Sequence, residues 1–268
     1  MRPGNYAQQA RTYDLTRRAS PTILGAVRRA LGEAGGRTLL DVAGGTGNYA
    51  VELARAGFRP VVADAEQAMV SRAAAKLPAG SCVAADAAAL PFRDGSFDCA
   101  TLVSAFHLFA DKAGALREVR RVLRDGPLVM QVFTRENLVP LFTHEYFDHP
   151  IHEEVRETEE DHVELLLTAG FHGVEARRLA YRGLEDGSLS ALQTDPALIA
   201  DEVHLKNTSY WQRMDEASRR AGLDKLRSDL RSGVLARRVE ASMASAATWG
   251  HVTVLAAHLD SGTSRHRR

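Results

Sequence analysis

The sequence has few cysteines, no excess of charge of either sign and no long apolar run. Its two cysteines, Cys82 and Cys99, each fall in an apolar, strand-like segment, which indicates buried free thiols and excludes a disulfide framework. Lysine plus arginine (34) equals aspartate plus glutamate (34), so the net charge is zero and the broad basic surface of a nucleic-acid-binding protein is not expected.

No stretch approaches the roughly 18 consecutive apolar residues that a membrane span requires. The first residues also lack the apolar core of a signal peptide. We therefore expect a cytoplasmic protein with a small-molecule partner, and neither a nucleic acid nor a membrane as its partner.

Apolar runs alternate with helical patterns through the first half of the chain. Short strands are predicted where an apolar run is bounded by turn residues, and a helix precedes the first of them from Ser20 to Leu31. The predicted strands are 38–42, 60–64, 82–86, 97–103 and 127–133, with helices after the glycines near 44, at 69–77 and at 113–123. This alternation implies parallel pairing and right-handed crossovers, and hence a doubly wound, Rossmann-like α/β sheet of seven mostly parallel strands.

The second half of the chain changes character. We expect a helix from Glu153 to Leu167, a strand over 174–181 and a last strand over 252–257, with only helical spacing in between. The predicted organisation is an N-terminal helical cap (1–35), a cofactor-binding Rossmann-like core (36–182), a helical lid insertion (183–247), a final strand that completes the core (248–260) and a disordered tail (261–268).

A glycine-rich turn follows the first predicted strand. Gly44, Gly45 and Gly47 let the backbone turn sharply and approach a ligand closely, and the helix after them offers free N–H groups. Ligands of such sheets bind at the carboxyl ends of the strands. Glycine loops of this kind are not specific, because the segment from Gly45 to Ala50 also satisfies the dinucleotide pattern G-x-G-x-x-G/A, so an NAD-dependent enzyme is a serious alternative.

Three aspartates near successive strand ends favour a different cofactor. Asp41 precedes the glycines, where a carboxylate would repel a pyrophosphate but attract the ammonium group of a methionine moiety. Asp64 can accept the hydroxyls of a ribose, which either cofactor would use. Asp86 can accept from the amino group of adenine while a neighbouring backbone N–H serves a ring nitrogen.

These residues resemble the class I S-adenosylmethionine-dependent methyltransferases, in the small-molecule branch that includes ubiquinone biosynthesis. The resemblance runs from about Leu39 to Phe133 and includes Asp64 in Val-Val-Ala-Asp-Ala and the run from Asp86 through Leu-Pro-Phe (90–92) to Phe97 and Asp98. The segment 165–171 before the sixth strand and the N-terminal stretch from Tyr6 to Tyr13 and Asp14 are also similar. One departure is Ala43, where the family usually has glycine.

The resemblance implies a set of cofactor contacts at the strand ends. The residues are Tyr13, Asp41, Ala43, Gly44, Gly45, Gly47, Asp64, Ala65, Asp86, Ala87 and Ser104. The cofactor would be S-adenosylmethionine, with S-adenosylhomocysteine as its product. Tyr13 would lie in a helix that covers the cofactor, or would only pack that helix.

Two histidines are candidate general bases for methyl transfer. His107 follows the fourth strand and His144 follows the fifth, and histidine is the usual proton acceptor near neutral pH. A structural role for either histidine remains an alternative. No metal is expected, because no histidine and glutamate pair has a metal-binding spacing.

The sequence thus predicts an enzyme, an S-adenosylmethionine-dependent methyltransferase that acts on a small molecule, such as a secondary metabolite of a bacterium. Two alternatives stay open. One is an RNA or protein methyltransferase, and the other is a protein that binds the cofactor but assists a non-methylating reaction such as a cyclisation.

Overall fold

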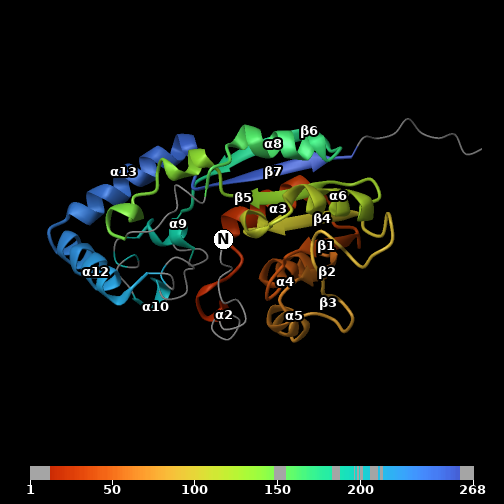
Figure 1. The fold of residues 1–268 in the computed structure, drawn as a ribbon, viewed down its shortest axis with the longest axis horizontal. Coiled ribbons are helices and arrows are strands. Elements are labelled where there is room, and N and C mark those ends of the chain that lie inside the picture. The colour runs from red at the N-terminus through yellow and green to blue at the C-terminus, as the bar shows by residue number, and fades with distance from the viewer. Residues whose placement is uncertain are drawn as a thin grey trace, which may run out of the picture. The chain divides into compact units, whose positions relative to one another are not determined.

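The structure is a computed structural model that describes residues 13–147, 155–182, 188–195, 197, 199, 202–205, 211 and 214–259. Its main feature is a seven-stranded sheet with the strand order β3-β2-β1-β4-β5-β7-β6 (Figure 1). The strands are β1 (Thr38–Val42), β2 (Arg59–Asp64), β3 (Cys82–Ala84), β4 (Cys99–Val103), β5 (Leu128–Val132), β6 (His172–Leu179) and β7 (Val252–His258). The predicted tail at 261–268 and Tyr6 lie outside the described residues.

The sheet confirms the predicted fold class. β1 pairs in parallel with β2 on one side and with β4 on the other, and β2–β3 and β4–β5 are also parallel. The strand order therefore reverses at β1 and β4, which is where ligands of doubly wound sheets bind. Leu39 and Leu40 in β1 have no exposed surface, as expected for a central strand covered on both faces.

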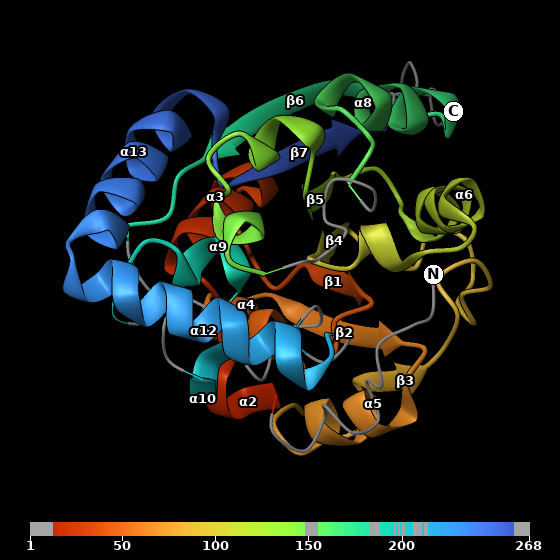
Figure 2. The same cartoon turned by 60° about the vertical axis from the view of Figure 1, so that its left-hand side comes forward.

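One helix precedes β1 and further helices follow β1, β2 and β4, as the sequence predicts. They are α3 (Pro21–Leu31), α4 (Asn48–Arg55), α5 (Gln67–Ala74) and α6 (Lys112–Val122). Figure 2 shows α4 and α5 beside the neighbouring strands β1, β2 and β3. The side chain of Glu66 caps α5 by accepting from the Ala68 N–H, and Asp111 caps α6 by accepting from the Gly114 N–H.

One predicted helix starts later than expected. α8 begins at Glu159 and ends at Thr168, and residues 155–158 are not helical. The backbone N–H of Arg135 donates to the carbonyl of Glu157 (2.9 Å), and the Glu136 carboxylate accepts from the Glu159 N–H (3.1 Å). These bonds from another segment fix residues 157–159 at the helix start, so the acidic run alone misplaced the boundary.

The chain divides into two compact units. The sheet unit comprises 25–132, 160–176 and the chain from 254 onward; the helical unit comprises the chain up to 24, 133–159 and 177–253. The core of the sheet unit packs strands β1, β4 and β5 against α6 and α8 through residues such as Leu40, Leu102 and Leu116. None of these three side chains is exposed.

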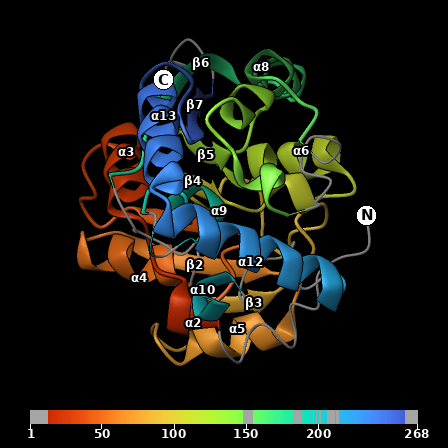
Figure 3. The same cartoon turned by 90° about the vertical axis from the view of Figure 1, so that its left-hand side faces the viewer.

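The helical unit has a core of its own. Every described element between 188 and 249 is helical: α9 (Leu189–Leu192), α10 (Glu202–Leu205), α12 (Glu216–Arg231) and α13 (Val234–Trp249). The short helices α2 (Tyr13–Thr16), η2 (Arg135–Leu138) and η3 (Thr143–Glu145) belong to it as well. Figure 3 shows α12 and α13, which pack on each other. Trp211 and Phe147 meet edge to face in this core, with ring centroids 5.7 Å apart.

No helix within the described ranges is both long and apolar enough to pass through a lipid bilayer.

Candidate functional site at the carboxyl edge of the sheet

Asp41 is a buried carboxylate in the middle of the sheet unit. It lies opposite Thr101 in the β1–β4 register, and its Oδ1 accepts a hydrogen bond from the Thr101 hydroxyl (2.8 Å). The other oxygen, Oδ2, is buried and has no hydrogen-bond partner among the described residues. Burial raises the pKa of Asp41 from 3.8 to about 7, although the Thr101 hydrogen bond lowers it, and the nearby Asp64 raises it further.

The glycine turn fits closely over Asp41. A Cβ atom on Gly44 would lie 2.5 Å from Asp41 Oδ2, so only glycine fits there. Ala43 has φ 51° and Gly45 has φ 58°, both in the left-handed region. A Cβ on Gly45 would meet no atom within 4 Å, so the turn presents an open backbone face at this point.

Asp64 joins the glycine turn to the end of β2. Its Oδ2 accepts from the Gly45 N–H and its Oδ1 from the Glu66 N–H, both at 2.8 Å. A carboxylate has about four acceptor positions, so these bonds leave room for ligand hydroxyls. Burial raises the pKa of Asp64, against the hydrogen bonds from Glu66 and Gly45 that lower it.

The end of β3 lies next to the end of β2. The Ala85 N–H donates to the Asp64 carbonyl (3.0 Å), and the exposed Asp86 accepts from the Ala88 N–H through Oδ1 (2.9 Å). Ala65 is exposed and Ala87 is half-buried. The structure thus brings Asp41, the glycine turn, Asp64 and Asp86 to one edge of one unit, as the sequence predicts.

The end of β4 completes this edge. Ser104 has φ 57°, and its hydroxyl donates to Gln131 Oε1 on β5 (2.5 Å). Gln131 is 2% exposed, and its amide donates to the Val132 carbonyl (2.9 Å). The short helix η1 (Phe106–Leu108) follows, and its His107 is exposed.

Two of the predicted site residues belong to the other unit. Tyr13 is half-buried in α2 and His144 is exposed in η3, both within the helical unit. Their part in the site stays a prediction. Across the described residues, no three His, Cys, Asp or Glu side chains are grouped as metal ligands would be.

Two residues of this edge were not predicted from the sequence. Thr101 holds Asp41, and Gln131 holds Ser104. Each is a polar residue inside an otherwise apolar strand, and that is a usable signal, because a fully buried polar side chain requires a partner. The sequence does not say which partner, since that depends on the strand register.

Comparison with known proteins agrees with this geometry. Residues 40–130 match the family described as methyltransferase domain. This match confirms the resemblance to methyltransferases over Leu39 to Phe133.

The chain is similar to curated demethylmenaquinone methyltransferases over less than half of its length. The demethylmenaquinone methyltransferase of Beutenbergia cavernae is 35% identical over 128 residues, which cover 46% of this chain and 53% of that protein. The one from Mycolicibacterium paratuberculosis is 39% identical over 127 residues, covering 44% and 52%. The chain spans about half the length of these curated relatives.

A solved structure is similar over most of the chain. A protein assigned as a methyltransferase from an antibiotic biosynthesis pathway of Anabaena variabilis superposes with a TM-score of 0.79 at 22% identity, covering 91% of this chain and 99% of that one. At this identity the likeness shows the fold alone, and it extends well beyond residues 40–130.

Proposed function

We propose that this protein binds S-adenosylmethionine at the carboxyl edge of the sheet unit and transfers its methyl group to a small molecule. The observation that carries the proposal is the buried Asp41 Oδ2 beneath Gly44, which no residue in the described part of the chain hydrogen-bonds. A buried carboxylate without a partner is costly, and a cation that reaches it would remove that cost.

The donor set fits this cofactor better than it fits a dinucleotide. The ammonium group of the methionine part would pair with Asp41 across the glycine turn, whereas a pyrophosphate would be repelled by Asp41 and Asp64 together. Asp64 would accept from ribose hydroxyls, and Asp86 would accept from the adenine amino group. Ala65 and Ala87 would contact the adenosine part with apolar surface.

The remaining predicted contacts hold the backbone around the cofactor. Gly45 and Gly47 would bring the turn close to it, and Ser104 would lie near the methionine part. The hydrogen bond from Ser104 to Gln131 fixes the turn after β4 in its left-handed conformation. We further expect Tyr13 to contact the cofactor.

The chain's contribution to catalysis would be mainly positioning. When bound, the cofactor supplies a methyl group activated by its sulfonium. Holding an acceptor atom in line with that group can account for much of the rate enhancement. His107, on η1 directly after β4, would accept the proton of a hydroxyl or amine acceptor, and His144 is the second candidate.

The acceptor is proposed to be a small molecule in the cytoplasm. The matched relatives are demethylmenaquinone methyltransferases, so a demethylated naphthoquinol is the first compound to assay. Their likeness covers about half of each chain, so the assay also needs a broad set of acceptors.

The proposal is tested by incubating the protein with methyl-labelled S-adenosylmethionine, demethylmenaquinol and a bacterial metabolite extract. We expect label in a small molecule and at least a tenfold lower rate for His107→Ala, because general bases contribute about 10²–10⁴-fold. His172→Ala, which changes another exposed histidine of the sheet unit, should leave the rate unchanged.

The other outcomes are informative. Equal rates for His107→Ala and the unchanged protein would remove His107 as a base. Binding of the cofactor without label transfer to any acceptor would contradict methyl transfer and favour a non-methylating role. The [4+2]-cyclase SpnF shares the fold, with a TM-score of 0.52 at 19% identity over 88% of this chain and 80% of that one.

A further inference from the structure

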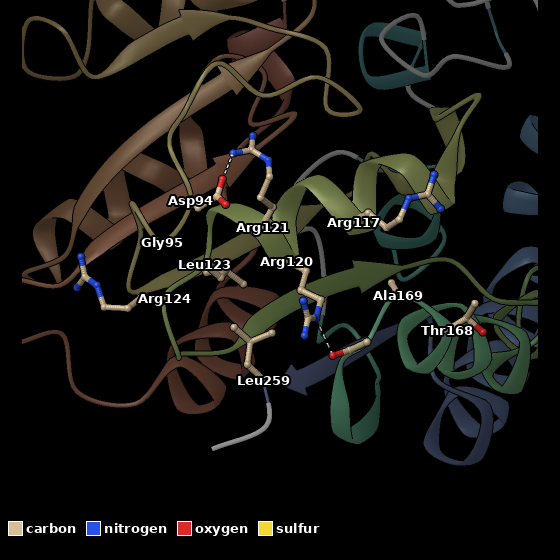
Figure 4. A pocket seen from close by; sticks show the side chains of 11 residues that line it. Asp94, Gly95, Arg117, Arg120, Arg121, Leu123, Arg124, Thr168, Ala169 and Leu259 are labelled. Carbon is tan, nitrogen blue, oxygen red and sulfur yellow. Dashed lines mark hydrogen bonds and ion pairs between the residues drawn. The ribbon is translucent and has the colours of Figure 1, made fainter. Parts of the chain in front are cut away.

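A pocket rich in arginine lies in the sheet unit, away from the residues described above. Its volume is about 630 Å³, within the range typical of small-molecule sites. The walls are formed by the C-terminal part of α6, the turn at Asp94 and Gly95, and the end of α8 (Figure 4). We call it the α6 arginine pocket.

The pocket lies at the opposite edge of the parallel strands. Gly95 comes shortly before β4, and Arg124 comes shortly before β5. The predicted cofactor residues instead follow the strands, as Ser104 follows β4. Because β4 and β5 are parallel, the α6 arginine pocket is at their amino ends and is separate from the proposed cofactor site.

Four arginines line this pocket with helical spacing. They are Arg117, Arg120, Arg121 and Arg124. Arg117, Arg120 and Arg121 lie within α6 at intervals of three and four residues, and Arg124 follows shortly after α6 ends at Val122. Arginine is suited to phosphate and carboxylate groups, because its planar guanidinium offers paired donors.

The donors of Arg121 are already occupied. Its guanidinium binds Glu118 through two nitrogens, Asp94 through a third contact (2.7 Å), and the carbonyls of Leu90 and Phe92. Figure 4 shows Arg121 directed at Asp94. Arg121 therefore holds the turn before β4 and is not a ligand donor.

Arg120 and Arg117 have donors left over. Arg120 uses only Nε, which donates to the Gly170 carbonyl (2.9 Å, the dashed line in Figure 4), and this leaves both terminal nitrogens. Within the described part of the chain, neither Arg117 nor Arg120 is paired with a carboxylate. Arg124 pairs with Asp98 but keeps 56% of its side chain exposed.

The acids around the pocket do not cancel this charge. Asp94 lines the pocket, and Glu118 and Asp98 pair with arginines of the same face. Three carboxylates against four guanidinium groups leave a net charge of plus one at the pocket. Among the described residues, Arg117 and Arg120 are its arginines without an ion pair.

An apolar floor and a glycine shape the pocket. Leu123 is buried, and Ala169 and Leu259 pack against the core beside it. Gly170 has φ 87°, and a Cβ there would lie 2.7 Å from Arg120 Nε, so glycine at this position allows the observed approach of Arg120. Guanidinium groups beside an apolar floor match a ligand that joins an anionic group to an apolar part.

We propose that the α6 arginine pocket binds an organic phosphate, with Arg117 and Arg120 on the phosphate and Leu123, Ala169 and Leu259 beneath the apolar part. The phosphate can belong to a nucleotide or to a lipid headgroup. This site is independent of the proposed cofactor site and does not require methyl transfer.

The test is isothermal titration of the protein with ADP and, separately, co-sedimentation with phosphatidylglycerol vesicles. Saturating S-adenosylhomocysteine is present so that ADP cannot report on the cofactor edge. We expect one of the two probes to bind, with affinity that falls as salt rises. Arg117→Glu should weaken it at least about tenfold, because one charged hydrogen bond is worth about 1.5–3 kcal/mol.

Two further variants separate a ligand contact from a folding effect. Arg117 is exposed and has no ion pair with any described residue, so Arg117→Glu should leave the melting temperature unchanged. Arg120→Ala should weaken the same probe, and Arg55→Glu, at an exposed arginine elsewhere in the sheet unit, should not. Binding of ADP alone identifies a nucleotide-type source, and binding of vesicles alone identifies a headgroup. Binding of neither probe, or equal binding by the Arg117 and Arg55 variants, would overturn the proposal.

Discussion

Asp41 has a buried carboxyl group, and burial makes its ionised form unfavourable in the folded protein. Asp41 is 1% exposed, and within the part of the chain that the structure describes only one of its carboxylate oxygens has a hydrogen-bond partner. Its raised pKa means that the folded protein binds a proton more tightly than the unfolded chain does. A group that opposes folding in this way is typical of a binding site, where a ligand compensates for it.

Replacing Asp41 with asparagine should stabilise the ligand-free protein at pH 8. The native carboxyl has a pKa near 7 against 3.8 unfolded, so its contribution to stability decreases as pH rises from about 4 to 7 and is least above 7. Asparagine keeps an acceptor for Thr101 and has no charge. We expect a gain on the order of 2 kcal/mol at pH 8 and a clearly smaller gain at pH 5, measured by denaturant unfolding at both pH values.

Asp98→Asn is the matched control with the opposite sign. Burial acts to raise the pKa of Asp98, but hydrogen bonds from Thr38 and the charge of Arg124 outweigh it, so the pKa is lowered. This carboxylate stabilises the fold above its unfolded pKa, and the stabilisation is lost as pH falls. Asp98→Asn should therefore be less stable than the unchanged protein at pH 8. A loss at pH 8 for both variants would contradict the account of Asp41.

Ala43→Gly should also raise stability. Ala43 has φ 51°, a conformation that costs a residue with Cβ about 1–2 kcal/mol, whereas glycine adopts it freely. Glycine loses more entropy on folding, so the net gain should be up to about 1 kcal/mol. Ala56→Gly is the control, because Ala56 ends α4 at an ordinary φ of −80° and should lose stability. Equal losses in thermal unfolding for the two variants would show that Ala43 is not strained.

At the scale of the helices, side-chain packing and helix propensity both favour alanine at Gly25, but they oppose each other at Gly222. Gly25 in α3 and Gly222 in α12 both sit inside helices, where alanine is favoured by about 1 kcal/mol. A Cβ on Gly25 would make an ordinary 3.5 Å contact with Arg29. A Cβ on Gly222 would lie 2.4 Å from the Phe147 ring and from the Tyr146 carbonyl.

We therefore expect Gly25→Ala to stabilise the protein by about 0.5–1 kcal/mol and Gly222→Ala to destabilise it by about 1–3 kcal/mol. Chemical denaturation of both variants measures the difference. Stabilisation by Gly222→Ala would mean that α12 does not pack closely on the segment at Tyr146 and Phe147.

The elements of the sheet unit were predictable because their pattern is local. Short apolar runs ended by acids predicted the strands, and the parallel arrangement followed from the alternation with helices. The start of α8 was not predictable, because the bond from Glu159 to Glu136 fixes it. Likewise, Asp41 was predicted from its position before the glycines, while its partner Thr101 required the β1–β4 register.

At the scale of the whole molecule, the net charge is zero, but acidic and basic side chains gather at opposite ends of the parallel strands. The carboxyl ends of the strands carry Asp64 and Asp86, and the amino ends of β4 and β5 carry the arginines of the α6 arginine pocket. Parallel pairing of β1 to β5 produces this separation, since the residues that follow these strands lie at one end of them and the residues that precede them lie at the other. Composition could not reveal either edge.

The central claim is that the carboxyl edge binds S-adenosylmethionine, and a thermal-shift titration tests it most directly. S-adenosylmethionine or S-adenosylhomocysteine at a hundredfold excess over its dissociation constant should stabilise the protein by about 2.7 kcal/mol, and NAD should not. Asp41→Asn, although more stable without ligand, should lose most of this shift. Stabilisation by NAD alone, or by none of the three compounds, would contradict the account.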